Sequence, residues 1–192
     1  MLKWLSPIIL SALLAGCEDP NWHTSDISDI MPDLDLSLVD ENGEQVEEDA
    51  YTGKTTLLYF GYTHCPDVCP TSLARMTAAI KKLDESARDD IQVLFVSVDP
   101  ERDTPARLRQ YTDVFGPQFI GLTGNTEQLD ELTNRYRVSY GYGDKDANGN
   151  YDVSHSSGIF VFNAQGDARL LMRNSDPIPS MVSDLKRLMA RG

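Results

Sequence analysis

Two long apolar runs, separated by a stretch with helical periodicity, limit most strongly what this chain can fold into. Residues 55–60 read TTLLYF and residues 91–98 read IQVLFVSV, without regular alternation of polar residues. Such runs are typical of strands buried on both faces of a parallel sheet. The order of strand, helix and strand predicts an α/β domain with a parallel-rich sheet. The apolar residues at helical spacing between the runs are Leu73, Met76, Ile80 and Leu83.

The rest of the chain continues this alternation. Thr104 and Pro105 are typical N-cap and first-turn residues, so a helix is expected from there to about Phe115. The pattern resembles a thioredoxin-like α/β fold, with a central mixed sheet flanked by helices, an inserted N-terminal hairpin, and a loop or hairpin before the His155 strand. The other expected elements are a strand through Leu34, Leu36 and Leu38 with a turn at 42–43, a strand at 119–122, a helix at 126–137, a hairpin of 158–162 and 168–172, and a helix at 180–190.

The first 16 residues have the pattern of an export signal. Lys3 precedes a short apolar stretch, which cannot span a bilayer because a spanning helix needs about 20 residues. The stretch ends in Leu14-Ala15-Gly16-Cys17, which resembles the end of a bacterial lipoprotein signal peptide. We therefore expect lipidation of Cys17; an ordinary secretory signal or an uncleaved anchor is the alternative.

This interpretation divides the chain into three parts. Residues 1–16 are the lipoprotein signal peptide, residues 17–32 a polar, flexible tether with a solvated His23, and residues 33–192 one folded domain. Acyl chains on Cys17 would anchor the domain without a spanning helix. The mature protein is expected to be exported, lipid-anchored to a membrane, and facing the periplasm of a bacterium.

The charge balance argues against one class of partner. The chain has 17 Lys and Arg against 30 Asp and Glu, a net charge of −13. Nucleic-acid binding needs clustered Lys and Arg to contact phosphates, and the sequence has no such cluster. We therefore expect no nucleic-acid partner, and a soluble, monomeric domain.

Two cysteines lie where a predicted buried strand gives way to a helix. Residues 65–69 read CPDVC, and functional groups collect at the carboxyl ends of strands in such sheets. A helix N-terminus favours thiolate over thiol, and the i, i+4 spacing puts both sulfurs on one face of a helical turn. Cys65 and Cys69 can therefore form a disulfide or bind one soft metal ion.

Three interpretations of this cysteine pair stay open on the residues alone. A structural disulfide would close a very small loop and stabilise the fold little. A redox dithiol is chemically reasonable, although dithiol oxidoreductases of this fold usually carry Cys-x-x-Cys. The wider spacing suits a soft ion such as Cu(I) or Zn(II), which needs a third ligand from elsewhere.

The chain offers three histidines as that third ligand. His23 lies in the predicted tether. His64 is adjacent to Cys65, so its side chain is expected to point away from a site that both sulfurs face. His155, which comes 86 residues after Cys69, is the remaining candidate.

Three motifs in the same order resemble the signatures of the Sco/SenC family. They are GYTHCPDVCP at 61–70, VDPERDTP at 98–105, and Tyr151-x-Val153-x-His155-Ser156. The resemblance implies a thioredoxin-like fold and one copper ion per monomer, as Cu(I) or Cu(II), with Cys65, Cys69 and His155 as ligands. It also implies a role at the dinuclear CuA centre in subunit II of cytochrome c oxidase, by copper delivery or cysteine reduction. A copper donor or a thiol reductant would be a further partner.

The chain departs from the family pattern next to the histidine. Many relatives have Asp directly before it, where this chain has Ser154. Because a ligating imidazole needs a hydrogen-bond acceptor to orient it, Asp152 or a backbone carbonyl is expected to substitute. Asp99 and Asp103 follow a strand end and are candidates for contact with the site or a partner. For Asp103, a purely structural role as a helix cap or ion-pair partner before Thr104 fits the sequence equally well.

These observations favour a metallochaperone over an enzyme. The alternative is a thiol–disulfide oxidoreductase that acts on exported cysteine proteins without copper transfer, with Cys65 and Cys69 as its catalytic redox pair. A peroxidase is disfavoured because Thr63 stands two residues before Cys65, not in a Thr-x-x-Cys arrangement. Residues 144–149 open like an EF-hand loop, but the twelfth position is His155 where Glu is needed, so we expect a polar turn.

Overall fold

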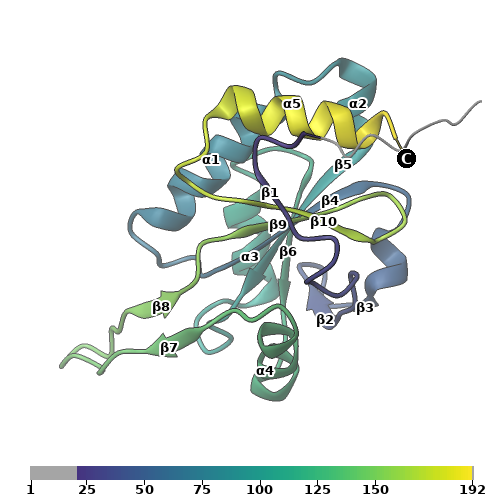
Figure 1. The fold of residues 1–192 in the computed structure, drawn as a ribbon. Coiled ribbons are helices and arrows are strands. Elements are labelled where there is room, and N and C mark those ends of the chain that lie inside the picture. Colours follow the sequence, from purple (N-terminus) through teal and green to yellow (C-terminus); the bar gives the residue numbers. More distant parts are fainter. Residues whose placement is uncertain (1–20, 192) are drawn as a thin grey trace, which may run out of the picture.

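An eight-stranded mixed sheet forms the centre of the computed structural model, which describes residues 21–191 (Figure 1). Its strand order is β1-β10-β9-β4-β5-β6-β2-β3. β4 runs parallel to β5 and β5 to β6, while the other neighbouring pairs are antiparallel. The strands are β1 (Ser25–Asp26), β2 (Ser37–Asp40), β3 (Gln45–Glu47), β4 (Thr55–Gly61), β5 (Ile91–Ser97), β6 (Phe119–Thr123), β9 (Ile159–Phe162) and β10 (Ala168–Met172).

Helices cover this sheet. α1 and α5 pack side by side on one side of the sheet, and α4 lies at the opposite side of the view (Figure 1). The Thr104 hydroxyl accepts a hydrogen bond from the backbone N–H of Arg107, so this residue caps α3 as expected. The helices are α1 (Val68–Ile80), α2 (Glu85–Asp89), α3 (Pro105–Thr112), α4 (Thr126–Arg135) and α5 (Ile178–Met189), with a 3₁₀ turn at Glu48–Tyr51.

β4 and β5 are buried at every position, as their continuous apolar runs predicted. Their largest buried side chains are aromatic, namely Tyr59, Phe60 and Phe95. The strand predicted through Leu34 and Leu36 begins later, at Ser37, although both leucines are buried. The short elements α2 and β1 were not expected, because each is too short to show a periodic pattern, whereas β7 belongs to the loop or hairpin predicted before the His155 strand.

A separate two-stranded hairpin carries His155. β7 (Tyr140–Tyr142) pairs antiparallel with β8 (Val153–His155), and the hairpin extends away from the main sheet at the lower left of Figure 1. The segment between the strands is a polar turn, as predicted, in which the Asp146 carboxylate accepts hydrogen bonds from the backbone N–H groups of Asn148 and Asn150. His155 is thus at the end of a short strand of its own, before β9.

The packed part of the chain begins before the predicted boundary at residue 33. Ser25 and Asp26 pair with β10, and Ile27 is buried. The buried Asp184 carboxylate of α5 accepts hydrogen bonds from the backbone N–H groups of His23 and Thr24 and from the Thr24 hydroxyl. Residues 23–32 are therefore attached to the domain by backbone pairing, by the Asp184 carboxylate and by the burial of Ile27, and the His23 side chain is exposed as expected.

Two predictions for the N-terminus fall outside the described residues. These are the signal peptide at 1–16 and lipidation of Cys17. Among residues 21–191, no helix is long and apolar enough to cross a membrane.

Candidate metal centre

The two cysteines lie at the junction between β4 and α1. β4 ends at Gly61, a short loop carries Cys65, and Cys69 is in the first turn of α1. Cys65 is 8% exposed and Cys69 is 0% exposed, and both are free thiols. The pair therefore lies just below the surface, with Cys65 as the only one of the two that solvent reaches.

Gly61 makes room for the deeper sulfur. A Cβ at this position would lie 2.9 Å from the Cys69 Sγ and 2.8 Å from the Phe95 ring. Real Cβ atoms essentially never approach other heavy atoms so closely, so only glycine fits here. The glycine at the end of the buried strand is thus a packing requirement of Cys69.

The helix start provides a donor to the shallower sulfur. The backbone N–H of Cys69 donates a hydrogen bond to the Cys65 Sγ at 3.4 Å. For Cys69, burial raises the pKa of the thiol well above its ordinary value, because the charged thiolate would be desolvated there.

His155 reaches the same place from β8. Its Nε2 lies 3.2 Å from the Cys69 Sγ. Its Nδ1 lies 3.0 Å from the Ser156 carbonyl oxygen, which can only accept, so Nδ1 carries the proton and donates. Nε2 then has a free lone pair that points at the sulfurs. The two Sγ atoms and a ring nitrogen all lie within 4.8 Å of one another.

Two tyrosines enclose the imidazole. The rings of Tyr59 and Tyr62 both contact it edge-on, with centroids 6.1 Å and 5.9 Å away. Burial lowers the pKa of His155, partly offset by its hydrogen bond to Ser156, which favours the neutral ring that a metal ion needs. The Tyr59 hydroxyl is buried and has no hydrogen-bond partner within residues 21–191.

These donors fit a soft or borderline metal ion. Two sulfurs and an imidazole nitrogen are the ligand types that copper and zinc prefer, and oxygen-preferring ions such as Mg²⁺ and Ca²⁺ do not match them. Asp99 and Asp103 belong to a second, separate group of possible ligands, together with His64. The geometry therefore describes a metal site with three protein donors.

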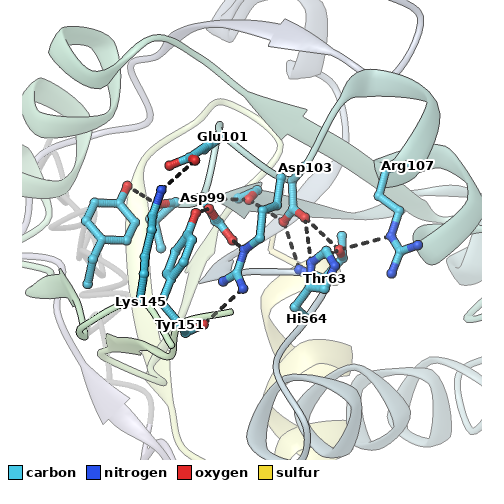
Figure 2. Close-up of polar contacts among 12 residues, drawn as sticks. Thr63, His64, Asp99, Glu101, Asp103, Arg107, Lys145 and Tyr151 are labelled. Carbon is cyan, nitrogen blue, oxygen red and sulfur yellow. Dashed lines mark hydrogen bonds and ion pairs between the residues drawn. The ribbon is translucent and has the colours of Figure 1, made fainter. Parts of the chain in front are cut away.

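Asp103 holds the loop that carries the cysteines (Figure 2). Its buried carboxylate accepts hydrogen bonds from the Thr63 backbone N–H at 2.8 Å, the Thr63 hydroxyl at 2.6 Å and the Ser97 hydroxyl at 2.6 Å. The His64 Nδ1 lies 3.5 Å from the same carboxylate. As predicted, His64 therefore points away from the sulfurs.

The other predicted acidic residues do not reach the metal site. Asp99 is fully buried, as is Asp103, so neither presents a carboxylate at the surface to a partner. Asp152 is exposed, and the acceptor for the His155 ring is the Ser156 carbonyl. Of the two substitutes expected for the acid missing at Ser154, the backbone carbonyl is therefore the one present, and Asp152 is not.

Comparison with known proteins decides the family. The SCO1/SenC family profile matches residues 31–190. The chain belongs to the SCO1/SenC family. An SCO2-like protein of Rickettsia conorii is 43% identical to it over 134 residues, which cover 69% of this chain and 64% of that protein. The match thus spans less than two thirds of that relative's length.

Solved SCO structures confirm the thioredoxin-like α/β fold with its central mixed sheet. The crystal structure of Arabidopsis thaliana ScoI with copper bound is similar with a TM-score of 0.77 and 33% identity, covering 83% of this chain and 99% of that one. The structure of Bradyrhizobium japonicum ScoI with copper bound has a TM-score of 0.74 and 34% identity, covering 82% and 99%.

Several residues around the SCO site were not identified from the sequence. Gly61 and Tyr59 were overlooked, although both precede the cysteine loop in the same buried strand and their alternate positions put them on one face. Arg102 and Tyr151 lie within the recognised motifs, but their contact joins segments 49 residues apart. Sequence spacing alone carries no signal for such a long-range pair.

Proposed function

We propose that this SCO1/SenC protein binds one copper ion per monomer through Cys65, Cys69 and His155. The observation that carries the proposal is the convergence of two thiols and a correctly oriented imidazole, whose ligand atoms lie within 4.8 Å of one another. Two relatives that match nearly their whole length to this chain have structures with copper bound.

The donor set suits both oxidation states of copper. Cu(I) is satisfied by two thiolates at low coordination number, whereas Cu(II) gains from the imidazole. The thiols must lose their protons to act as ligands, and the neutral His155 ring already offers Nε2. A disulfide between the cysteines would remove both sulfur ligands, so oxidation of the pair and copper binding exclude each other.

The biological role proposed is assembly of the CuA centre in subunit II of cytochrome c oxidase. In this role the protein delivers copper or reduces the cysteines of subunit II, and it exchanges with a copper donor or a thiol reductant. The family membership and the set of three donors support a protein that gives its ion to a partner, because sites that retain a structural metal ion usually have four protein ligands.

We propose further that the protein is acylated at Cys17 and faces the periplasm. The test compares membrane fractionation of the full chain with that of Cys17→Ala, without detergent. Release of the variant alone supports the anchor. Equal partition of both into the soluble fraction, or into the membrane, contradicts it.

Metal content and the Cu(II) spectrum of the reduced protein test the copper site. We expect one copper per chain and sulfur-to-copper charge-transfer absorption. His155→Ala should lose the Cu(II) form, while Cu(I) remains bound by the two thiolates. His64→Ala is the matched control, because its ring is adjacent to Cys65 yet faces Asp103. Full retention of Cu(II) by His155→Ala contradicts the ligand assignment.

Thiol–disulfide exchange is the second candidate function, and the different exposure of the two sulfurs supports it. Cys65 is partly exposed and accepts a backbone hydrogen bond, so it is the attacking thiol, and buried Cys69 is the resolving one. Cys69→Ser should therefore trap a mixed disulfide with the partner, and Cys65→Ser should not. If His155→Ala restores oxidase assembly in a strain that lacks this protein, reduction is the physiological act; if it fails, copper transfer is.

A further inference from the structure

We propose that the turn at residues 98–103 is a bracket that positions His155 over the two sulfurs, with Arg102 as the residue that docks the β7–β8 hairpin. This inference rests on the proposed function, because it explains how one of the proposed copper ligands is held in place. The claim is that buried contacts between the hairpin and this turn determine the position of the hairpin.

The hairpin needs an external support. Each of its strands has three residues, and β8 pairs with β7 and with no strand of the main sheet. An isolated two-stranded hairpin is marginally stable in water. The hairpin also extends away from the body of the molecule (Figure 1). The position of the imidazole at the end of β8 therefore depends on what fixes the hairpin to the domain.

Arg102 provides the strongest contact of this kind. Its guanidinium carbon lies 3.6 Å from the centroid of the Tyr151 ring, and its Nη1 donates to the Tyr151 carbonyl oxygen at 2.9 Å. Tyr151 is four residues before His155 and two residues before β8 begins. One side chain thus contacts both the ring and the backbone of the segment that leads to the ligand. The planar guanidinium suits this, because its face stacks on the ring while its edge donates hydrogen bonds, whereas an ammonium is a compact point charge.

Asp99 completes the contact from the turn itself (Figure 2). Its fully buried carboxylate accepts from the Arg102 Nε at 2.6 Å and from the Tyr151 hydroxyl at 2.6 Å. The Tyr142 hydroxyl adds a tie from the other strand, donating to the Val98 carbonyl oxygen at 2.7 Å. Both strands of the hairpin are therefore attached to one short turn.

The same turn also holds the cysteine loop. Asp103 accepts two hydrogen bonds from Thr63, two residues before Cys65. The Val98 N–H donates to the Gly61 carbonyl oxygen at 2.9 Å. Residues 98–103 thus contact the thiol half of the site on one side and the histidine half on the other. This turn sets the distance between the two halves.

The simplest competing explanation is that these contacts only stabilise the fold as a whole. Local hydrogen exchange separates the two explanations, because a bracket controls the opening of the hairpin without unfolding the sheet. We therefore measure amide exchange of the metal-free, reduced chain in residues 140–155 and in β4 and β5. Thermal unfolding of each variant monitors global stability.

Arg102→Lys and Tyr142→Phe are the test variants, and Lys145→Ala is the matched control. Arg102→Lys keeps the charge beside Asp99, and Tyr142→Phe removes one hydroxyl from a side chain that is half-exposed, so both should fold. Lys145 joins the same hairpin to the same turn, through an exposed ion pair with Glu101. Such surface pairs contribute little, so its loss should have little effect.

We expect Arg102→Lys to speed exchange in residues 140–155 about tenfold, the effect of a lost buried hydrogen bond to a charged group, with β4 and β5 unchanged. Tyr142→Phe should act in the same direction with a smaller effect. The affinity for Cu(II), which needs His155, should fall in both variants, and the affinity for Cu(I) should stay.

Unchanged hairpin exchange in both variants overturns the bracket, whatever copper does. Equal acceleration in the hairpin and in β4 and β5 also overturns it, because the contacts then serve global stability alone. Failure of the proposed function looks different: the wild-type chain would bind no copper, while the exchange pattern of the metal-free chain would still show the bracket.

Discussion

The cysteine loop and the β7–β8 hairpin bring ligands to one site by opposite means. The loop connects a fully buried strand to a helix, and its sulfurs are 8% and 0% exposed. The hairpin extends from the domain, and its tip is exposed and polar. The thiols are therefore positioned by the core, whereas the imidazole is positioned by a few long-range contacts at the periphery.

This difference separates two properties that the proposed role in copper delivery would need. A ligand pair fixed by the core keeps its geometry when the ion leaves, so the site is ready to be loaded again. A ligand on a peripheral hairpin can withdraw at the cost of a few contacts, which favours release to a partner. Variants in the two regions should accordingly differ in their effects on stability and on metal binding.

The largest contrast in stability is expected between two aspartates that each accept three hydrogen bonds. Asp103→Ala leaves buried donors of Thr63 and Ser97 unpaired, so we expect a loss of about 3 kcal/mol of unfolding free energy. Asp146 accepts its three bonds in the exposed hairpin turn, and Asp146→Ala should change stability little. Urea titration of both variants measures the difference, and equal losses would contradict the contrast.

Two glycines offer the next comparison. A methyl group at Gly61 would collide with the Cys69 Sγ and the Phe95 ring, and overpacking of this kind costs about 1–3 kcal/mol. Gly61→Ala should thus lower thermal stability and displace the sulfur, weakening Cu(I) binding. The same change at Gly141 in the hairpin meets only the Ser154 Oγ at an ordinary 3.5 Å. Unaltered Cu(I) affinity in Gly61→Ala would show that Cys69 tolerates displacement.

The pH dependence of copper affinity should come from the cysteine thiols of the site. Burial raises the pKa of Cys69, so this group is protonated at neutral pH and must release its proton to bind the ion. Affinity should therefore rise with pH, by up to about tenfold per pH unit for each proton released.

His155 should contribute little to the change of copper affinity with pH near neutral pH. Burial lowers the pKa of His155, so the ring is already neutral there and releases no proton. Cu(I) affinity of the wild type and of His155→Ala, measured by competition with a chelator over a pH series, should have equal slopes. A slope that is lost with His155 would assign the proton release to the imidazole instead.

The smallest effect on copper affinity is expected from Ser154→Asp, which restores the aspartate that many relatives have directly before the histidine. Ser154 lies on the outer face of β8, and the ring is already held by the Ser156 carbonyl. Ser154→Asp should therefore change Cu(II) affinity by less than about threefold, as an exposed charge does. A large gain in affinity, read by competition titration, would mean that the carbonyl orients the ring poorly.

Sequence reasoning predicted the parts of this molecule that depend on local pattern. The apolar runs of β4 and β5, the Thr104 cap and the helix after Cys69 are each encoded within a few adjacent residues. β1 has no such pattern, because it forms by pairing with β10, which is far away in the sequence.

The site divides in the same way. The spacing of Cys65 and Cys69 predicted their shared face. Exclusion of His23 and His64 left His155 as a candidate, and the family resemblance identified it as a ligand. The contact between Arg102 and Tyr151 could not be predicted, since it depends on how two loops 49 residues apart meet in space.

The hydrogen bonds from His23 and Thr24 to Asp184 limit the distance between the domain and a bilayer to which Cys17 would be anchored. From Cys17 to His23 is six residue steps, and an extended chain covers about 3.6 Å per step, so the reach is roughly 20 Å. Asn21 also contacts Arg187 near the end of α5, on the opposite side of Figure 1 from the β7–β8 hairpin. An acylated Cys17 would then seat the α5 end against the lipid headgroups and turn the metal-binding face outward.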